Sequence, residues 1–375
     1  MLTADLVHPS SCFEYLRRKK NKKYFMLTLR ERIGSLARLG QIFRQAAGEK
    51  PGEEDHALYD VLSKAIIRAA EENLWFTEPF IRSALHALAR MLDEEKLRQW
   101  TGPYRLPDEP EHPRTVGVIM AGNIPLVGFH DMLCVLISGH RLLGHLSSKD
   151  RILPVAVRDL LTALHPGWKE KIQLTGEHLE NMDTVIATGS NNTSRYFEYY
   201  FGKYPHIIRK NRNSAAFLTG KETPEELGLL ADDVFLYFGL GCRNVSLLFV
   251  PKGYDFAPLL HTFSEKYGNL ALHKKFTNNY RYHRGIFLME RIPHTDAGFF
   301  LLREDPAPAS PAAVLHYHTY SHPQEVEEYL YVIRNEIQCR VGNLPGWQAF
   351  GSTQQPEPWD YADGIDTLKF LQFAE

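Results

Sequence analysis

The feature that most constrains the fold is a repeated strand, turn and helix pattern that begins at Thr115. Short apolar runs (VGVIMAG, RLLGHL, VIATGS, HIIRK and AAFL) are separated by helical stretches such as LVGFHDMLCVLISG, ILPVAVRDLLTALH and NTSRYFEYYFG. Strands that alternate with helices of this length predict a parallel sheet with helices on both faces. Ligands of such sheets bind at the carboxyl ends of the strands. The polar residues that follow the runs are therefore candidate ligand-binding residues: Gly122-Asn123, Ser147-Ser148-Lys149 and Gly189-Ser190-Asn191.

Two further regions flank this pattern. Residues 27–101 are predicted to be helical, with one helix over residues 54–73 and another that opens at Thr77, a good N-cap followed by Pro79. After Gly220 a second unit begins, with a helix over residues 222–237, a glycine-rich turn FGLGC and a strand VSLLFV. Further strand-like runs follow at GIFLME, GFFLLRE, AAVLHYHTY and IQCRV. The chain is thus predicted to hold two α/β units and a helical N-terminal segment.

The first 25 residues differ from the rest. They carry a basic run, LRRKKNKK, without the apolar stretch of a secretory signal. We expect residues 1–25 to be a disordered extension and Met26 to be the natural start of the protein. The rival interpretation is a basic arm that binds a partner.

Charge and cysteine usage exclude several classes of function. Lys and Arg number 43 and Asp and Glu 45, so the formal net charge of -2 gives no overall field for nucleic acid. No apolar run approaches the ~20 residues of a membrane helix. The four cysteines form no CxxC pair, which argues against a disulfide framework or zinc ribbon and favours the cytoplasm. His316 and His318 share one face of a predicted strand, which we interpret as a polar face; no metal site is expected.

Cys242 is the residue with the clearest chemical potential. It lies in YFGLGCRNVS, where Gly239 and Gly241 allow a bend and a close approach of substrate. Arg243 follows directly, and a cation beside a thiol favours the reactive thiolate. The alternative is a small buried hydrophobic residue. That alternative is the expected role of Cys134, inside DMLCVLI, and of Cys339.

Several motifs in order resemble one family. AGNIPLVGFHD, LSSKD, VIATGSNN, YFGLGCRNVS, ASPAAVL and DYADGIDTLKFL are similar to the acyl-CoA reductases, which include the fatty-acid reductase of bacterial bioluminescence. That family belongs to the aldehyde dehydrogenase superfamily. The resemblance runs from about Met26 to the C-terminus. It implies a helical N-terminal segment with an NAD(P)-binding domain over residues 26–218, a catalytic domain over 219–345, and a C-terminal segment, 346–375, that packs back on the core.

The resemblance also implies roles for two residues of the reaction centre. Cys242 matches the catalytic nucleophile. Asn123 matches the asparagine whose side-chain amide completes an oxyanion hole with the backbone N–H of the cysteine. Fixed donors at a developing oxyanion are worth several kcal/mol, so the role is chemically sound. The alternative for Asn123 is a turn residue before Pro125.

The cofactor residues come from the same resemblance. Gly189 and Ser190 match a Gly-Ser turn under the cofactor diphosphate, where helix N–H groups suit phosphate; a plain helix cap is the alternative. Ser147, Ser148 and Lys149 are placed near the adenosine ribose. Here Ser148 stands where the superfamily often has a ribose-binding glutamate, so NADPH is preferred, with NADH as the second choice. Glu304 resembles the glutamate that contacts the nicotinamide ribose; a solvated loop acid is the alternative.

One departure bears on the reaction. Hydrolytic aldehyde dehydrogenases carry a glutamate upstream of the nucleophile that activates water, but HIIRKNRNSAAFL, residues 206–218, contains no acidic residue. The predicted function is therefore NADPH-dependent reduction of an acyl-CoA or acyl-protein thioester to an aldehyde through an acyl-cysteine. The alternatives are a reductase of an acyl phosphate and a non-catalytic dehydrogenase-like subunit. Homo-oligomers are common in the superfamily, so the resemblance leaves a homo-oligomer possible here, although no segment of the sequence shows an interface.

Overall fold

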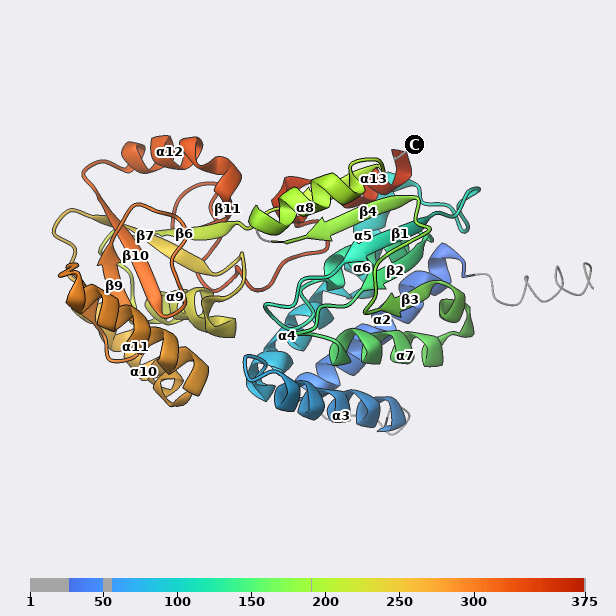
Figure 1. Cartoon of the computed structure of the whole chain (residues 1–375), viewed down its shortest axis with the longest axis horizontal. Helices are drawn as coiled ribbons and strands as arrows, with labels where there is room; N and C mark the ends of the chain where they lie inside the picture. The colour runs from blue at the N-terminus through green and yellow to red at the C-terminus, as the bar shows by residue number, and fades with distance from the viewer. Residues whose placement is uncertain (1–26, 50–55, 190, 374–375) are drawn as a thin grey trace, which may run out of the picture.

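The computed structural model describes residues 27–49, 56–189 and 191–373, and it consists of two lobes, each built on a sheet (Figure 1). One lobe holds the N-terminal helices and β1 to β5, and the other holds β6 to β11. The expected extension over residues 1–25 lies outside the described residues.

The N-terminal segment is helical, as predicted. Its helices are α2 (Leu29–Ala47), α3 (His56–Glu72), α4 (Glu78–Met91) and α5 (Glu94–Thr101). A capping box opens α2: Thr28 Oγ1 accepts from the N–H of Glu31, and Glu31 Oε2 accepts from the N–H of Thr28. Thr77 does occupy the N-cap of α4, but its side chain makes no capping hydrogen bond. Leu36, Leu39 and Phe43 of α2 are fully buried in the core of this lobe.

The first sheet is parallel throughout and has the strand order β3-β2-β1-β4-β5. Its strands are β1 (Thr115–Ile119), β2 (Arg141–His145), β3 (Ile172–Thr175), β4 (Thr184–Thr188) and β5 (His206–Arg209). The connecting helices are α6 (Phe129–Ile137), α7 (Ile152–Leu164) and α8 (Asn191–Phe201). Because β1 is central, the carboxyl ends of β2 and β4 lie on either side of the loop that follows β1. The predicted parallel sheet is therefore confirmed, and β3 is a strand that the sequence analysis did not assign.

The second sheet has the order β11-β6-β7-β10-β9-β8, and only the short β8 is antiparallel to its neighbour. Its strands are β6 (Asn213–Phe217), β7 (Val245–Pro251), β8 (Thr295–Asp296), β9 (Leu301–Glu304), β10 (Val314–Tyr320) and β11 (Ile337–Val341). Side chains of α9 (Pro224–Phe235) and α10 (Ala257–Tyr267) pack in one core cluster with Leu248 and Val250 of β7. Side chains of α12 (Pro323–Val332) pack in another cluster with Leu247 and Phe249. The alternating residues of β7 thus face two separate cores.

Two details differ from the sequence analysis. The run GIFLME is not a strand: it ends helix α11 (Lys274–Met289), in which Phe276 and Phe287 are the buried residues and Leu288 and Met289 are exposed. A short apolar run cannot be assigned to strand or helix by periodicity alone. The prediction of a strand at GIFLME was wrong because its apolar residues are the last turn and a half of a helix. In addition, β6 pairs with β7 and β11 and so belongs to the second sheet. The chain therefore leaves the first sheet after β5, which ends at Arg209, whereas the sequence analysis placed the domain boundary after residue 218.

The C-terminal segment crosses back to the first lobe. Helix α13 (Thr367–Phe373) lies beside α6, and the carbonyl of Leu371 lies 3.2 Å from His140 Nε2. Figure 1 shows this red segment above the green strands of the first sheet. Within residues 27–49, 56–189 and 191–373, none of the helices has the length and hydropathy that a membrane crossing requires.

Candidate active site

The candidate site lies where the two lobes meet. Asn123 follows the carboxyl end of β1, and Cys242 precedes the amino end of β7. The Asn123 side chain donates a hydrogen bond from Nδ2 to the carbonyl of Leu240, at 2.7 Å, two residues before the cysteine. The structure therefore brings together the loops of the two residues to which the resemblance assigns the chemistry.

The loop of Asn123 is fixed by its neighbours. A Cβ at Gly122 would lie 2.4 Å from Ser147 Oγ, so this position needs glycine for the loop after β1 to pack on the loop after β2. Leu126 has a left-handed backbone, with φ of 55°, and its N–H donates to Asp150 Oδ2 at 2.8 Å. Asp150 is 4% exposed, and burial raises its pKa to about 7. Asp150 thus anchors the asparagine loop, a role that the sequence analysis did not assign to it.

The loop of Cys242 is unusual in its backbone. Tyr237 and Phe238 have φ of 55° and 60°, and Gly239 has φ of 73°. Left-handed conformations at bulky residues are strained, and strain of this kind is common at functional sites when the surroundings hold it in place. The rings of Tyr237 and Phe238 are both buried and pack edge-on against Phe80 of α4. Burial of these rings holds the strained turn.

Asn244 closes the same loop. Its Oδ1 accepts from the N–H of Gly241 at 2.8 Å, and its Nδ2 donates to the carbonyls of Leu236 at 2.9 Å and Asp233 at 3.1 Å. The side chain is 2% exposed, so its polar atoms are satisfied by the loop rather than by water. The sequence analysis assigned no role to Asn244. Its position two residues after Cys242, within the motif YFGLGCRNVS, is the feature of the sequence that could have indicated one.

The Cys242 thiol is partly buried and forms no disulfide. Burial raises the pKa of the thiol; a hydrogen bond from the backbone N–H of Arg212 lowers it, Asp363 raises it, and Arg243 and Arg212 lower it. Arg243 does lower the pKa of the thiol, as expected, but burial raises it by more, so the net shift is upward. The Arg243 guanidinium donates to the carbonyl of Asp360 at 2.9 Å and lies 3.5 Å from Cys339 Sγ, so its charge is shared with other partners.

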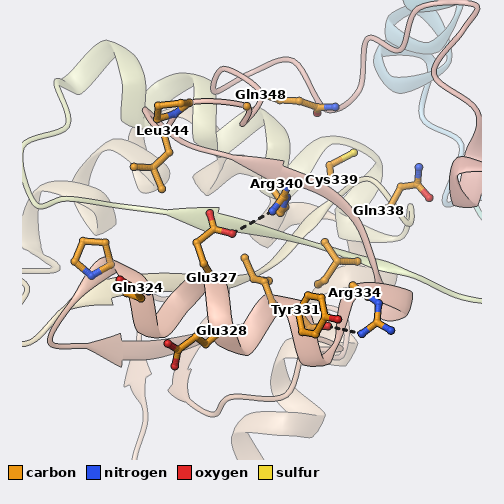
Figure 2. A pocket seen from close by; sticks show the side chains of 15 residues that line it. Gln324, Glu327, Glu328, Tyr331, Arg334, Gln338, Cys339, Arg340, Leu344 and Gln348 are labelled. Atoms are coloured by element: carbon orange, nitrogen blue, oxygen red, sulfur yellow. Dashed lines mark hydrogen bonds and ion pairs between the residues drawn. The ribbon is translucent and has the colours of Figure 1, made fainter.

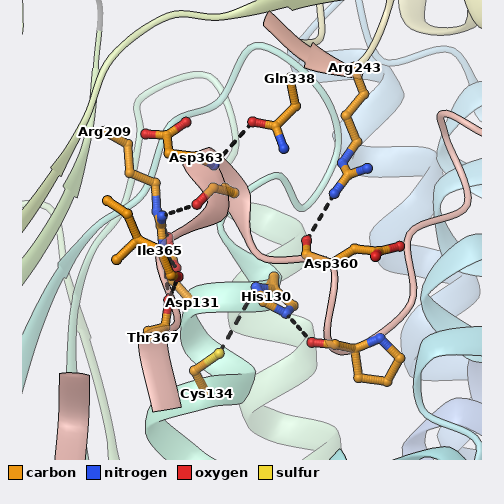
Figure 3. A network of polar contacts seen from close by, with 12 residues as sticks. His130, Asp131, Cys134, Arg209, Arg243, Gln338, Asp360, Asp363, Ile365 and Thr367 are labelled. Carbon is orange, nitrogen blue, oxygen red and sulfur yellow. Dashed lines mark hydrogen bonds and ion pairs between the residues drawn. The ribbon is translucent and has the colours of Figure 1, made fainter. Parts of the chain in front are cut away.

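The C-terminal strap, residues 357–367, lies against this loop and is held by side chains of both lobes (Figure 3). Arg209 donates to the carbonyl of Ala362 at 2.6 Å and forms an ion pair with Asp131 of α6 at 2.8 Å. Asp363 forms an ion pair with Arg212 at 2.9 Å, and its N–H donates to Gln338 of β11 at 3.1 Å. The strap thereby supplies a carboxylate to the neighbourhood of Cys242, whereas residues 206–218 supply none. The sequence analysis did not foresee this contribution.

The residues proposed to hold the adenosine and diphosphate of a cofactor follow the carboxyl ends of β2 and β4, the two neighbours of β1. Ser147, Ser148 and Lys149 follow β2, and the side chains of Ser148 and Lys149 are exposed. Gly189 follows β4, and a Cβ there would lie 2.7 Å from Phe197 Cε2, so glycine lets α8 begin close to the strand. Ser190 lies outside the described residues. A ligand at this edge of the sheet would meet the exposed side chains of Ser148 and Lys149.

Glu304 is not brought to Cys242. It pairs across the sheet with Tyr317, which pairs with Leu248, three residues inside β7. Glu304 is therefore separated from the start of β7 by two strand spacings, roughly 10 Å, as well as along the strand. Its carboxylate is exposed and accepts from Thr319 Oγ1 at 3.2 Å. Glu304 is thus an exposed acid at the carboxyl end of β9.

The histidines of β10 and a cavity between α12 and β11 lie outside the site. Nδ1 of His316 lies 2.9 Å from the carbonyl of Ala307, and the described residues hold no group of His, Cys, Asp or Glu suited to a metal ion. A cavity of about 1030 Å³ opens between α12 and β11 (Figure 2). An ion pair of 3.3 Å between Glu327 and Arg340 crosses it, and neither Asn123 nor Cys242 lines it.

Comparison with solved structures decides the fold. The HpcC protein of Thermus thermophilus matches with a TM-score of 0.60 and 12% identity, over 85% of this chain and 70% of its own. The indole-3-acetaldehyde dehydrogenase AldA of P. syringae, determined with NAD+ and IAA, matches with a TM-score of 0.59 and 13% identity, over 86% and 73%. The chain has the aldehyde dehydrogenase fold. An aldehyde dehydrogenase of Bacillus cereus also matches, with a TM-score of 0.57 and 14% identity, over 84% and 72%.

The aldehyde dehydrogenase fold confirms the predicted fold class, with a parallel-sheet domain, a second α/β domain and a helical N-terminal segment. No protein-family model matches the chain. No curated protein matches it either.

Proposed function

We propose that this protein reduces an acyl-CoA or acyl-protein thioester to an aldehyde, with Cys242 as the nucleophile. The observation that supports the proposal most directly is the 2.7 Å hydrogen bond between the Asn123 side chain and the turn of Cys242. A thiol and an amide donor held together where two α/β lobes meet are suited to acyl transfer.

The first half of the reaction follows from these groups. The Cys242 thiol loses its proton, and the sulfur attacks the thioester carbonyl, so a new carbon–sulfur bond forms and negative charge develops on oxygen. Collapse of this adduct breaks the bond to the coenzyme A sulfur, which leaves as a thiolate and takes up a proton. Asn123 has two N–H groups on Nδ2. One is donated to Leu240, and the other is free to donate to the oxyanion.

The second half requires a reductant. NADPH, when bound, supplies hydride to the acyl-cysteine, and this is the chemistry that the chain's own residues cannot provide. Ser147, Ser148 and Lys149 would hold its adenosine end, and Gly189 and Ser190 its diphosphate. No carboxylate stands among residues 147–149, so a 2′-phosphate meets no repulsion there and Lys149 can pair with it. NADH remains the second choice.

Cofactor preference is tested by Lys149→Glu. The variant places a carboxylate where the 2′-phosphate would lie, so we expect NADPH binding to weaken at least tenfold more than NADH binding. Fluorescence titration with both cofactors measures the ratio. Lys169→Glu, on the same lobe but outside the residues assigned to the cofactor, is the matched charge control. Equal losses for the two cofactors would show that Lys149 does not meet the ribose.

The proposed function itself is tested by the fate of the acyl-enzyme. Asp363 is a carboxylate that interacts with Cys242, and burial raises its pKa, but its Oδ1 is already engaged by Arg212 at 2.9 Å, which leaves it less available to a water molecule. We therefore expect acyl-CoA without NADPH to leave an acyl group on Cys242 that persists for intact-mass detection. Added NADPH should release aldehyde, and added coenzyme A should return acyl-CoA.

The other outcomes separate the alternatives. Prompt appearance of free fatty acid, with no adduct, would indicate a thioesterase or an oxidising dehydrogenase. An adduct formed from an acyl phosphate but not from acyl-CoA would indicate a reductase of that other activated carboxylate. A thiol that neither donor acylates, and whose labelling neither NADPH nor acyl-CoA alters, would indicate a non-catalytic subunit.

A further inference from the structure

A second cavity lies between α4 and the segment that precedes the turn of Cys242. Its volume is about 340 Å³, near the lower end of the roughly 300–1,000 Å³ of small-molecule sites. Arg82 of α4, Tyr237 and Gln354 line it, together with apolar side chains that include Pro79, Ala87 and Leu236. None of the described residues that line it is Asp or Glu. The cavity is thus partly apolar and carries a positive charge.

Gln354 is a buried polar side chain without a partner. It is only 7% exposed, yet its Nε2 has no hydrogen-bond partner among the described residues. The great majority of buried polar side-chain atoms in proteins are hydrogen-bonded, and one that is not destabilises the fold. Because Gln354 lines the cavity, this amide is a donor that a ligand in the cavity can use.

The chain before Gln354 is held firmly in place. Thr353 donates to Asp233 Oδ1 from its backbone N–H at 3.0 Å and from Oγ1 at 2.7 Å. The N–H of Gly351 donates to the other oxygen of the same carboxylate at 2.6 Å. Asp233 is fully buried in α9, so these bonds are shielded from water. Gln354 therefore extends from a fixed segment, which favours a preformed site.

Arg82 supplies the charge. Its Nη1 donates to the carbonyl of Ala46 at the end of α2, which orients the guanidinium. Its Nη2 lies 3.5 Å from Glu78 Oε2, a long ion pair between two partly exposed side chains. A guanidinium has five N–H donors, so donors remain for a ligand. Arginine recognises carboxylates particularly well, because two of its N–H groups can meet both oxygens.

We propose that this cavity binds a small organic carboxylate. Its oxygens accept hydrogen bonds from Arg82 and from Gln354 Nε2, and its short carbon chain contacts Pro79, Ala87 and Leu236. The apolar part of the lining favours such a ligand over inorganic phosphate, which has no carbon chain to bury. Cys242 does not line the cavity, so this site is separate from the proposed reaction centre and does not rest on the proposed function.

The test is a ligand-observed NMR titration of the full chain with butyrate, at low ionic strength and without acyl-CoA or NADPH. We expect saturable binding with a Kd in roughly the millimolar range, as suits a ligand of so few atoms. Butanamide has nearly the same shape without the charge and should bind at least tenfold more weakly. Inorganic phosphate should also bind more weakly than butyrate.

Three variants locate the site. Arg82→Gln should weaken butyrate binding at least tenfold. Gln354→Leu should weaken it about fivefold or more, and it should raise the melting temperature of the ligand-free protein by about 1–2 °C, because an apolar side chain replaces an unpartnered amide. Glu78→Gln should strengthen binding about twofold, since it releases Arg82 from its ion pair.

Arg98→Gln is the matched control. Arg98 of α5 pairs with Glu94 four residues before it, just as Arg82 pairs with Glu78, but it does not line the cavity. We expect this variant to bind butyrate as the unmodified protein does.

Four results would overturn the proposal. They are a titration that does not saturate, equal butyrate binding by Arg82→Gln and Arg98→Gln, phosphate binding as tight as that of butyrate, and a Gln354→Leu variant that loses stability while it binds butyrate normally. The last of these would assign the amide a structural role only.

Discussion

Replacement of Cys242 by alanine is expected to abolish aldehyde formation from acyl-CoA, with a loss of at least a thousandfold. The covalent acyl-enzyme needs a nucleophile at this position, and the flanking residues Gly241 and Arg243 carry none. Aldehyde formation from acyl-CoA, followed as loss of NADPH absorbance, measures the effect.

The fold should survive this change. Cys242 is not fully buried, and its side chain is small, so the melting temperature should move by only a few degrees. Cys339→Ala is the matched control: it removes a buried thiol from β11, and we expect it to retain most of the activity. An alanine variant at 242 that still reduces acyl-CoA would exclude covalent catalysis there.

The strands of the first sheet illustrate what local sequence determines. The runs around β1, β2, β4 and β5 are short, apolar and bounded by glycine or polar residues, and each is a strand in the structure. AAFL is likewise a strand, but it joins the second sheet, because pairing is decided by residues far away in sequence. GIFLME shows the opposite case: its apolar residues belong to a helix whose period a six-residue window cannot resolve.

In the candidate site, too, some features follow from local sequence and others depend on residues that are distant in the sequence. The positions of Asn123 and Cys242 in glycine-rich turns were visible in the sequence, and the structure joins their loops. The state of the thiol was not visible, because it depends on burial and on Asp363, which is 121 positions further along the chain. The adjacent cation Arg243 favours the thiolate, but the desolvation of a buried thiol outweighs it. Electrostatics of this kind are set by the tertiary fold.

Asn123→Ala is expected to lower the rate of Cys242 acylation by roughly a hundredfold, about 2.7 kcal/mol, as loss of one oxyanion donor does in other enzymes. The free N–H of the amide is the donor that would meet the oxyanion, and alanine has no such group. Single-turnover acylation of Cys242 by acyl-CoA, without NADPH, measures this step directly.

The difficulty is that Asn123 also holds the carbonyl of Leu240, so alanine could slow the reaction by loosening the turn. Alkylation by iodoacetamide separates the two causes, because this reaction needs the thiol but develops no oxyanion. If Asn123 stabilises the oxyanion, acylation falls about a hundredfold while alkylation changes by less than about threefold. If the asparagine only positions the turn, both rates fall together, and a loss of acylation of tenfold or less would place Asn123 among the structural residues of the loop.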